Sequence, residues 1–542
     1  MLLFLTGPAG AGKTTAIKAA ETFCFQFCTS AGILWTETTF FYTAYTGSAA
    51  SAFGGRTITK ASGMCSQNIT DKQRLEWSQC KILVIDEVSF MTENELMKLD
   101  TKLRQYGNRN KVYGGYSIIF GGDFRQLAKG KKNELLYSTL SKRFFEQNLN
   151  GIIILQNEHR FRNDPEFGKL LSDFWAGDLT EEQRNLINTR VIGERGQTMP
   201  ETIPESHDWN YACPTNKERN AISAGIFKKH IELTHPAWDS EQLPPDHTII
   251  IEGAFGPTCS SNKKKRKIRN ALRHRIIESC GDADIEYGTN KLADPALCLY
   301  SGISLVYVAN NDAMDQKPPR GNGTVVKFIS TKLKRGINSR KIRQYNGRKV
   351  WSVNIKNVEH ITVELMDNSD EIDNANHTLT SLKEQYNESP TTEINNRIAE
   401  LERKISKMTM DRRFNIEPSD HEVTVTVRPS KSSTLEDRYD LKMRLLPVNI
   451  STASTGHKLQ GRSKDTLIIT SWPNFKNNYI FNNWEYVVLS RVRTLSGLYL
   501  FQPIDLDKSF APSEELNQFI ARARHHEKRL LELREKNMHN FP

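Results

Sequence analysis

The sequence predicts an α/β fold of two units of parallel β-sheet, with a small β-barrel inserted into the second unit. Short apolar runs alternate with helical patterns through the first half, as in a parallel sheet covered on both faces. Short β runs with turn residues between them replace that rhythm from about residue 323 to 428, and α/β alternation returns near residue 445. A chain of 542 residues also exceeds one core, so several domains are expected.

The first unit is expected to span residues 1–150. Apolar runs predict strands at 2–5, 82–85 and 117–120, and a further strand at 152–155, just past that boundary. Helical patterns cover 15–28 and 93–105. Strands and helices therefore alternate along this part of the chain.

The second unit is expected to begin at 151–322 and to resume at 441–510. Residues 165–175 and 181–189 predict helices, 211–213 a strand, and 190–300 carry little pattern. Strands are predicted again at 445–450, 466–470 and 498–501. A charged helix covering most of residues 511–542 ends the chain, and we expect it to pack on the surface.

The inserted barrel is predicted at 323–440, from β runs at 324–329, 350–355, 360–365 and 422–428. Within it, residues 378–410 carry apolar residues at spacings of three and four on both sides of a breaker. This pattern predicts a helical hairpin. The seam is about two heptads long, so it favours packing of the two arms over recruitment of a partner.

Composition narrows the class of protein. No apolar stretch approaches a membrane span of about 18 residues, and the eight cysteines form no Cys-x-x-Cys pair. We therefore expect an intracellular, reducing compartment and no membrane partner. Lysine and arginine exceed aspartate and glutamate by 74 to 63, which suggests a polyanionic partner. The basic run 263–269 has three readings: a nuclear import signal, a phosphate-backbone contact or a solvated loop.

A phosphate-binding loop follows the first apolar run. Its glycines Gly7, Gly10 and Gly12 let backbone N–H groups converge on an anion. Lys13 adds a charge for the β- and γ-phosphates, and the Thr14 hydroxyl, next to Thr15, can hold Mg²⁺. The segment predicts a nucleotide site between a strand and a helix.

Two further strand ends carry polar residues suited to that site. Asp86 and Glu87 follow a buried strand, where Asp86 can coordinate Mg²⁺ and Glu87 can orient or deprotonate a water. Gln126 follows the next strand, where its amide can sense a γ-phosphate while Asp123 braces the loop.

Beyond these residues, the sequence resembles superfamily 1 DNA helicases of the PIF type, relatives of RecD and Dda. The resemblance rests on matching segments in matching order along most of the chain: 43–50, 55–58, 86–91, 122–127, 158–167, 213–216, 455–463 and 486–494. It implies two RecA-like P-loop NTPase domains. It also implies that the inserted barrel is SH3-like.

The resemblance also implies an ATP- and Mg²⁺-dependent helicase moving 5′→3′ on single-stranded DNA, serving DNA repair, recombination or replication. Arg160 and Arg491 would reach the phosphates from the second domain. Single-stranded, forked or tailed DNA would be contacted by residues of three segments: Thr43, Thr46 and Gly47; Thr215 and Asn216; and His457 and Lys458. The chain begins almost at the phosphate loop, so the upstream segment with the family's adenine-contacting glutamine is expected to be absent.

Two alternative functions are open on the residues alone. A P-loop phosphotransferase acting on a small molecule would explain the first 130 residues but leaves Arg160, His457 and Arg491 without a role. A nucleic-acid-binding protein without motor activity would not require Lys13 and Glu87. Hydrolysis of ATP stimulated by DNA separates both alternatives from a helicase.

Overall fold

The computed structural model describes most of the chain. The residues left out are 52–54, 67, 129–133, 141–144, 157–158, 193–209, 258–295, 309–323, 336–339, 367–378, 381–382, 384–397, 399–401, 403–411, 428–436, 461–462, 474–482, 507–510 and 539–542. The basic run 263–269 lies outside the described residues, as does most of the predicted hairpin at 378–410.

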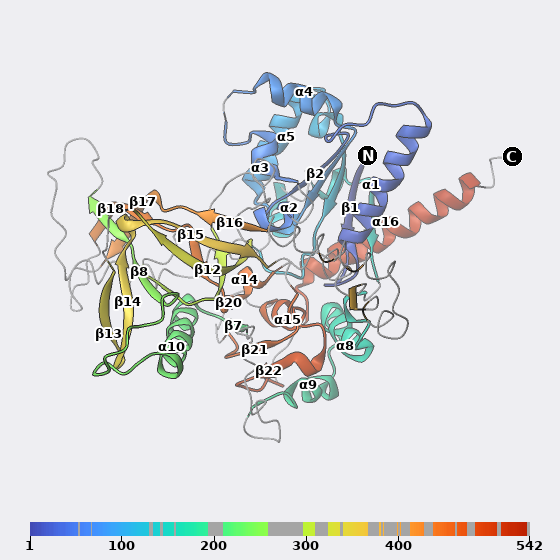
Figure 1. Cartoon of the computed structure of the whole chain (residues 1–542). Coiled ribbons are helices and arrows are strands. Elements are labelled where there is room, and N and C mark those ends of the chain that lie inside the picture. Colours follow the sequence, from blue (N-terminus) through green and yellow to red (C-terminus); the bar gives the residue numbers. More distant parts are fainter. Residues whose placement is uncertain are drawn as a thin grey trace.

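The first unit is a six-stranded parallel sheet in the order β3-β2-β4-β5-β1-β6 (Figure 1). Its strands are β1 (Leu2–Thr6), β2 (Phe40–Ala44), β3 (Arg56–Thr57), β4 (Ile82–Asp86), β5 (Ser117–Gly121) and β6 (Gly151–Ile154). β6 pairs with β1, so the first sheet extends past the predicted boundary at residue 150. The predicted parallel sheet of the first half is confirmed.

Helices connect these strands, and several begin at well-defined caps. They are α1 (Lys13–Ser30), α2 (Gly47–Ser51), α3 (Ile58–Ser62), α4 (Asp71–Gln79), α5 (Glu93–Tyr106) and α6 (Glu134–Tyr137). The Thr92 hydroxyl accepts a hydrogen bond from the Glu95 N–H, and the Glu95 side chain accepts one from the Thr92 N–H. This reciprocal cap fixes the start of α5 where the sequence predicts it.

The second unit contains a four-stranded parallel sheet in the order β20-β7-β21-β22. Its strands are β7 (Tyr211–Cys213), β20 (Ala453–Thr455), β21 (Leu467–Ile469) and β22 (Leu498–Leu500). The helices of this part are α8 (Pro165–Ala176), α9 (Glu181–Asn188), α10 (Asn216–Thr234), α14 (Gly456–Leu459) and α15 (Trp484–Leu489). The chain between β7 and β20 contributes α10 and the β-rich lobe.

The β-rich lobe consists of three further sheets: β10-β8-β14-β13, β16-β15-β12-β11-β19 and β17-β18-β9 (Figure 1). Their strands are β8 (Ile249–Glu252), β9 (Ala254–Pro257), β10 (Ala296–Leu299), β11 (Ser304–Tyr307), β12 (Val325–Leu333), β13 (Lys341–Tyr345), β14 (Arg348–Asn354), β15 (Val358–Leu365), β16 (Arg413–Ile416), β17 (Ser419–Val427), β18 (Asp437–Leu445) and β19 (Val448–Ile450). The lobe thus begins at Ile249 rather than at 323, because β8 pairs with β14.

The stretch predicted to lack pattern, 190–300, contains the 19-residue helix α10 as well as β8, β9 and β10. Only Arg219, Phe227 and Ile231 of α10 are buried. Such a narrow buried stripe leaves a weak periodic signal in the sequence. None of the helices that the structure describes is long and apolar enough to cross a membrane.

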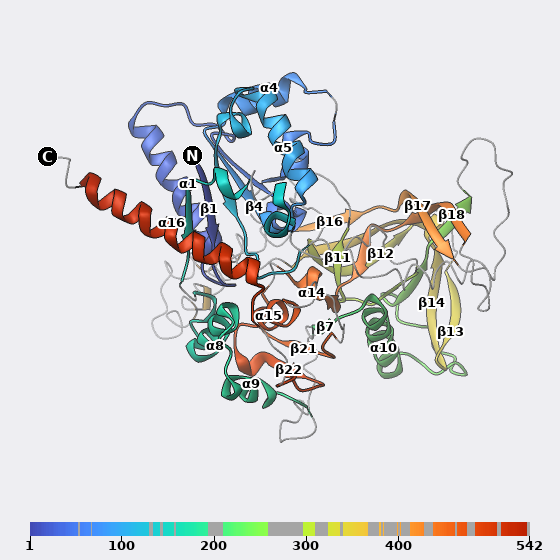
Figure 2. The same cartoon turned by 180° about the vertical axis from the view of Figure 1, so that it is seen from behind.

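The C-terminal helix α16 (Glu514–Met538) returns to the first sheet and contacts β6 (Figure 2). Its Phe519 is buried, with ring centroids 5.6 Å from Phe4 and 5.2 Å from Phe124. Phe4 lies on the strand before the phosphate loop, and Phe124 lies in the loop that carries Gln126. The helix is therefore part of the core next to the phosphate loop, although the sequence predicts only a helix packed on the surface.

Candidate active site

The phosphate loop between β1 and α1 requires its glycines. Gly7, Gly10 and Gly12 have φ angles of 149°, 86° and 87°, a region that L-residues with side chains avoid. A Cβ on Gly10 would lie 2.6 Å from the Cβ of Arg160, and one on Gly7 would lie 2.5 Å from the Leu155 carbonyl oxygen. The loop is thus closely covered by the segment that follows β6.

Lys13 lies at the start of α1 and turns back on the loop. Its Nζ donates hydrogen bonds to the carbonyl oxygens of Gly7 at 2.7 Å and Pro8 at 3.2 Å. Burial lowers the pKa of Lys13, and the charges of Asp123, Glu87 and Asp86 oppose that shift. The ammonium group and all three carboxylates therefore share one site. Thr14 and Thr15 are exposed on the first turn of α1.

Asp86 and Glu87 stand at the end of β4, as predicted. The Asp86 carboxylate accepts hydrogen bonds from the Glu87 N–H at 2.8 Å and from the Tyr42 hydroxyl at 2.9 Å. Glu87 has a φ of 56°, in the left-handed region that is strained for a non-glycine residue. Burial, and then the neighbouring charge of Asp86, raise the pKa of Glu87 to about 7. A carboxyl group with this pKa can accept a proton near neutral pH.

Gln126 is buried beside Asp123 in the loop after β5. Its Nε2 donates to Asp123 Oδ2 at 3.1 Å, whereas its Oε1 has no hydrogen-bond partner among the described residues. Asp123 Oδ1 accepts from the Arg125 N–H at 2.9 Å and from the Trp175 indole N–H at 3.0 Å. The loop is consequently held by its own backbone and by α8.

Both predicted arginines meet at α15. Arg160, in the 3-10 turn His159–Phe161, donates from Nη1 to the Ser490 carbonyl oxygen at 3.0 Å. Arg491 donates from Nε to the Val487 carbonyl oxygen and from Nη2 to Ser490 Oγ, both at 2.7 Å. Burial and then the charge of Arg491 lower the pKa of Arg160 to about 9. Burial also lowers the pKa of Arg491, against the charges of Glu87 and Asp123. The structure thus brings Arg491 to the carboxylates of the first unit and Arg160 to Lys13.

Two residues of this site were not predicted. Arg125 is buried and donates from Nη1 to Asn483 Oδ1 at 3.0 Å and from Nη2 to the Phe174 carbonyl oxygen at 3.3 Å. Tyr486 is fully buried, and its hydroxyl accepts a hydrogen bond from the Ala9 N–H at 2.7 Å. Both residues lie inside segments that carry the family resemblance, 122–127 and 486–494. The sequence could therefore have marked them as candidates, but it gave no indication of their roles.

The prediction that the Thr43 side chain contacts DNA is wrong. Thr43 is fully buried in β2, and its hydroxyl donates to the Val84 carbonyl oxygen at 2.6 Å. β2 lies inside the sheet between β3 and β4, and all five of its residues are buried, so both of its faces are covered. Thr46 and Gly47 follow at the start of α2, where Thr46 Oγ1 accepts from the Ala49 N–H at 3.3 Å.

The other predicted DNA residues lie at strand ends of the second sheet. Thr215 follows β7 and caps α10, accepting from the Glu218 N–H at 3.1 Å, and Asn216 begins that helix. His457 and Lys458 lie on α14, directly after β20. His457 Nε2 is 2.9 Å from the Ala128 carbonyl oxygen of the first unit, and burial lowers the His457 pKa. His457 therefore joins the two units.

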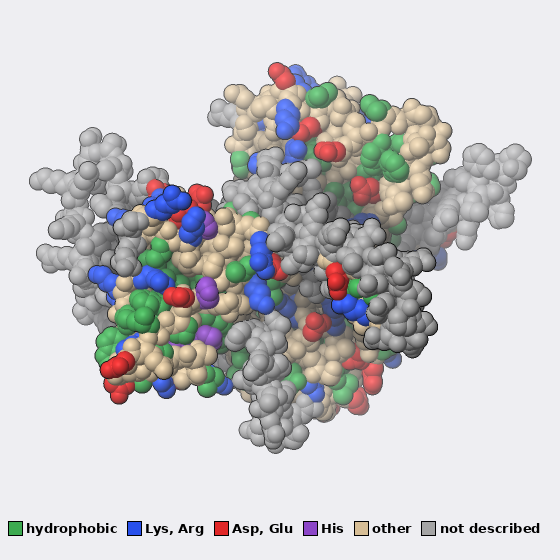
Figure 3. All heavy atoms as spheres, viewed as in Figure 1, with side chains coloured by type: hydrophobic (Ala, Val, Ile, Leu, Met, Phe, Trp, Pro, Cys, Tyr) green, Lys and Arg blue, Asp and Glu red, His purple; other side chains and the backbone are tan. Residues whose placement is uncertain are grey.

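Charge on the molecular surface is mixed. On the face in Figure 3, Lys and Arg side chains lie over the β-rich lobe and along its border with the α/β units, interspersed with Asp and Glu. The described surface on this face thus does not display one uninterrupted basic stripe.

The comparison with known proteins agrees with this geometry. Residues 1–185 match the model of the PIF1-like helicase family. The ATP-dependent DNA helicase PIF7 of Trypanosoma brucei brucei is 31% identical over 209 residues, which are 35% of this chain and 20% of that protein. The ATP-dependent DNA helicase PIF1 of Danio rerio is 30% identical over 195 residues, 33% of this chain and 28% of that protein. The chain thus spans less than a third of the length of these curated relatives.

Solved structures extend the likeness in fold. Bacteroides Pif1 bound to single-stranded DNA superposes with a TM-score of 0.57 at 17% identity, covering 96% of this chain and 93% of the other. Pif1 helicase from Candida albicans gives a TM-score of 0.55 at 17% identity, covering 96% and 95%. Residues 1–185 therefore match the PIF1-like helicase family in sequence, and nearly the whole chain shares the fold of these Pif1 structures.

Proposed function

We propose that this chain is an ATP-dependent DNA helicase that moves 5′→3′ along single-stranded DNA and unwinds forked or tailed duplexes. The observation that carries the proposal is the pair of arginines at α15, which lie across the unit boundary from Lys13 and Glu87. A site split in this way lets nucleotide binding close the units and loss of the γ-phosphate open them. Repair, recombination and replication are the processes that such an activity would serve.

The residues of the site divide the work of hydrolysis. Backbone N–H groups around Gly7, Gly10 and Gly12 and the Lys13 ammonium group would bind the phosphates. Glu87 would orient and deprotonate the attacking water, for which a pKa near 7 is suited.

Gln126 would sense the γ-phosphate through its amide: the nitrogen can donate to a phosphate oxygen, and the oxygen, buried without a hydrogen-bond partner in the described part of the chain, can accept from the attacking water. Arg160 and Arg491 would neutralise charge on the transferred phosphoryl group, a role worth about 10³ to 10⁵ in rate.

Thr14 and Asp86 are the residues that fit a magnesium ion. The exposed Thr14 hydroxyl and the partly buried Asp86 carboxylate supply the oxygen ligands that Mg²⁺ prefers. A bound Mg²⁺ would neutralise phosphate charge during hydrolysis. The hydrogen bonds that Asp86 accepts from Tyr42 and from the Glu87 N–H hold this carboxylate in place.

Single-stranded DNA would cross the strand ends of both units. Thr46 and Gly47 would contact it from the first unit, and Thr215, Asn216 and Lys458 from the second. The N-terminus of α10 favours phosphate, because the positive end of the helix dipole attracts anions. His457 already bonds to Ala128, so it would act by coupling the units as much as by touching DNA.

The β-rich lobe would contribute the small SH3-like barrel. The five-stranded sheet β16-β15-β12-β11-β19 supports this, since β12 and β15 shift register twice and such shifts curve a sheet. An ion pair of 2.7 Å between Lys383 and Glu402 supports the helical hairpin at 378–410. Its two partners belong to the two predicted arms.

Measuring ATP turnover with and without single-stranded DNA tests the proposal. Wild-type turnover should rise when DNA is added, and Lys13→Ala should abolish turnover while retaining DNA binding. Lys18→Ala, which changes an exposed lysine on the same helix, is the matched control and should turn over ATP normally. ATP turnover that does not change when DNA is added would favour a small-molecule phosphotransferase. Unchanged turnover in Lys13→Ala would contradict the proposed function.

A further inference from the structure

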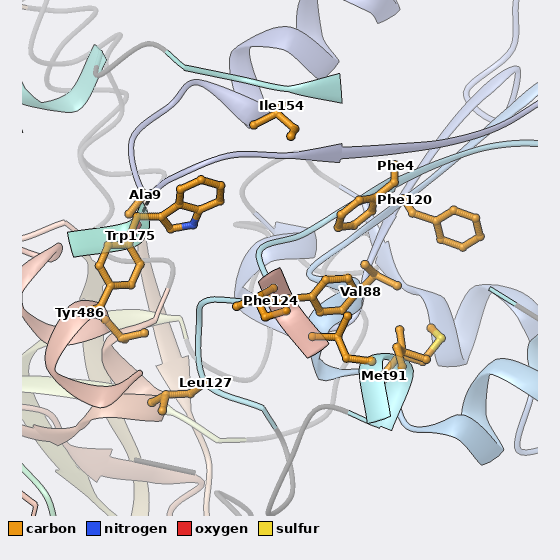
Figure 4. Close-up of a cluster of buried hydrophobic side chains, with 14 of the residues drawn as sticks. Phe4, Ala9, Val88, Met91, Phe120, Phe124, Leu127, Ile154, Trp175 and Tyr486 are labelled. Atoms are coloured by element: carbon orange, nitrogen blue, oxygen red, sulfur yellow. Dashed lines mark hydrogen bonds between the residues drawn. The ribbon is translucent and has the colours of Figure 1, made fainter. Parts of the chain in front are cut away.

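A hydrogen bond between the units ends on the phosphate loop itself. The Tyr486 hydroxyl, on α15, accepts it from the Ala9 N–H at 2.7 Å. Both residues are buried, and Figure 4 shows Tyr486 pointing toward Ala9, beside Trp175. Pro8, the preceding loop residue, has no N–H to offer, and Lys13 occupies the carbonyl oxygens of Gly7 and Pro8. The Ala9 N–H is thus the described contact by which the second unit holds this half of the loop.

The same short helix holds both arginines. Ser490 directly follows α15, where its N–H donates to the Tyr486 carbonyl oxygen at 3.0 Å, and its own carbonyl oxygen accepts from Arg160 at 3.0 Å. Arg491 is fixed by Ser490 Oγ and by the Val487 carbonyl oxygen. The segment that begins with α15 therefore contacts the phosphate loop and also anchors both cationic side chains.

The hydroxyl and the ring of Tyr486 have separate tasks. The ring packs edge-on against Phe174, with centroids 5.7 Å apart, in the core that spans both units. Burial raises the pKa of Tyr486, so the hydroxyl stays neutral and does not repel a phosphate anion nearby. A phenylalanine would retain the packing and lose only the bond to Ala9.

We propose that Tyr486 is a positioning residue: its bond to Ala9 sets the phosphate loop at the correct distance from Arg160 and Arg491. The bond then acts on the hydrolytic step, where the arginines are needed, more than on nucleotide affinity, which comes from the loop and Lys13. This inference rests on the proposed ATPase function of the site.

The test is the split between turnover and binding in Tyr486→Phe. We expect kcat for DNA-stimulated ATP hydrolysis to fall about tenfold, or about 1.4 kcal/mol. Affinity for a fluorescent ADP analogue should stay within about twofold, which also reports that the variant is folded. Tyr300→Phe, which removes a buried hydroxyl in the other core, is the matched control and should leave both quantities unchanged.

A second variant separates positioning from general loosening of the core. Phe174→Leu weakens the packing of the Tyr486 ring and leaves its hydroxyl in place. If Phe174→Leu lowers the thermal midpoint of unfolding by about as much as Tyr486→Phe does, its kcat should still stay within about twofold of wild type.

Three results would overturn the inference: wild-type kcat in Tyr486→Phe, a loss of nucleotide affinity in that variant as large as its loss of kcat, or an equal loss of kcat in Phe174→Leu. A wild-type protein without DNA-stimulated turnover would instead refute the proposed function.

Discussion

Glu87→Gln should stabilise the protein at alkaline pH, because the substitution removes a carboxylate that the folded site disfavours. Burial and Asp86 raise the pKa of Glu87 from an ordinary value of 4.5 to about 7. A raised pKa means that the folded state binds the proton more tightly, so stability is full below about pH 4.5 and is lost as pH rises toward 7 and above. Glutamine has nearly the same shape and does not titrate.

The magnitude follows from the two pKa values. The difference between the folded and unfolded pKa values predicts that the free energy of unfolding of the wild-type protein falls by at most roughly 2–3 kcal/mol between pH 5 and pH 8. It is an upper bound because Glu87 is only partly buried and water screens part of the charge.

Urea unfolding at pH 5, 6, 7 and 8 without nucleotide or metal measures the stability gain, which should grow with pH. Glu241→Gln, an exposed site, should show no such trend. A gain that is flat with pH, or larger at pH 5, would refute the reasoning.

Three further predictions concern other parts of the molecule. Phe519→Ala should destabilise the protein by about 3–5 kcal/mol in urea unfolding, because it removes a buried ring from the core under the phosphate loop. Phe23→Ala, at a ring that is 67% exposed, should cost less than about 0.5 kcal/mol, and equal losses would show that α16 does not pack as described. Arg491→Ala should lower ATP turnover by about 10³ or more with nucleotide affinity nearly retained, so a merely tenfold loss would contradict its proposed role. Lys458→Ala should reduce the slope of log affinity for single-stranded DNA against log salt by about 0.7, whereas an unchanged slope would remove it from the DNA path.

Local patterns account for what the sequence predicted correctly. The apolar run before Asp86 requires burial on both faces, so it forms the central strand β4 wherever the rest of the sheet lies. The start of α5 is set by Thr92 and Glu95, three residues apart. The glycines of the phosphate loop are equally local, since each needs a φ angle that other residues avoid.

Contacts between distant segments explain what the sequence did not predict. Ala9 and Tyr486 are 477 residues apart, and the sequence pattern around neither residue predicts a contact with the other. Phe519 looks like one apolar residue in a charged helix until α16 is placed against β6. Thr43 resembles a polar strand-end residue, and only its position between β3 and β4 shows that its hydroxyl is used inside the sheet.

Unwinding of forked duplexes that carry only a 5′ or only a 3′ tail tests the central claim most directly. With ATP and Mg²⁺, the account predicts strand separation from the 5′-tailed fork, and none from that fork with Lys13→Ala. Product from the 3′-tailed fork alone would contradict the proposed direction. Absence of product from either fork, alongside DNA-stimulated ATP turnover, would contradict the claim that hydrolysis is coupled to unwinding.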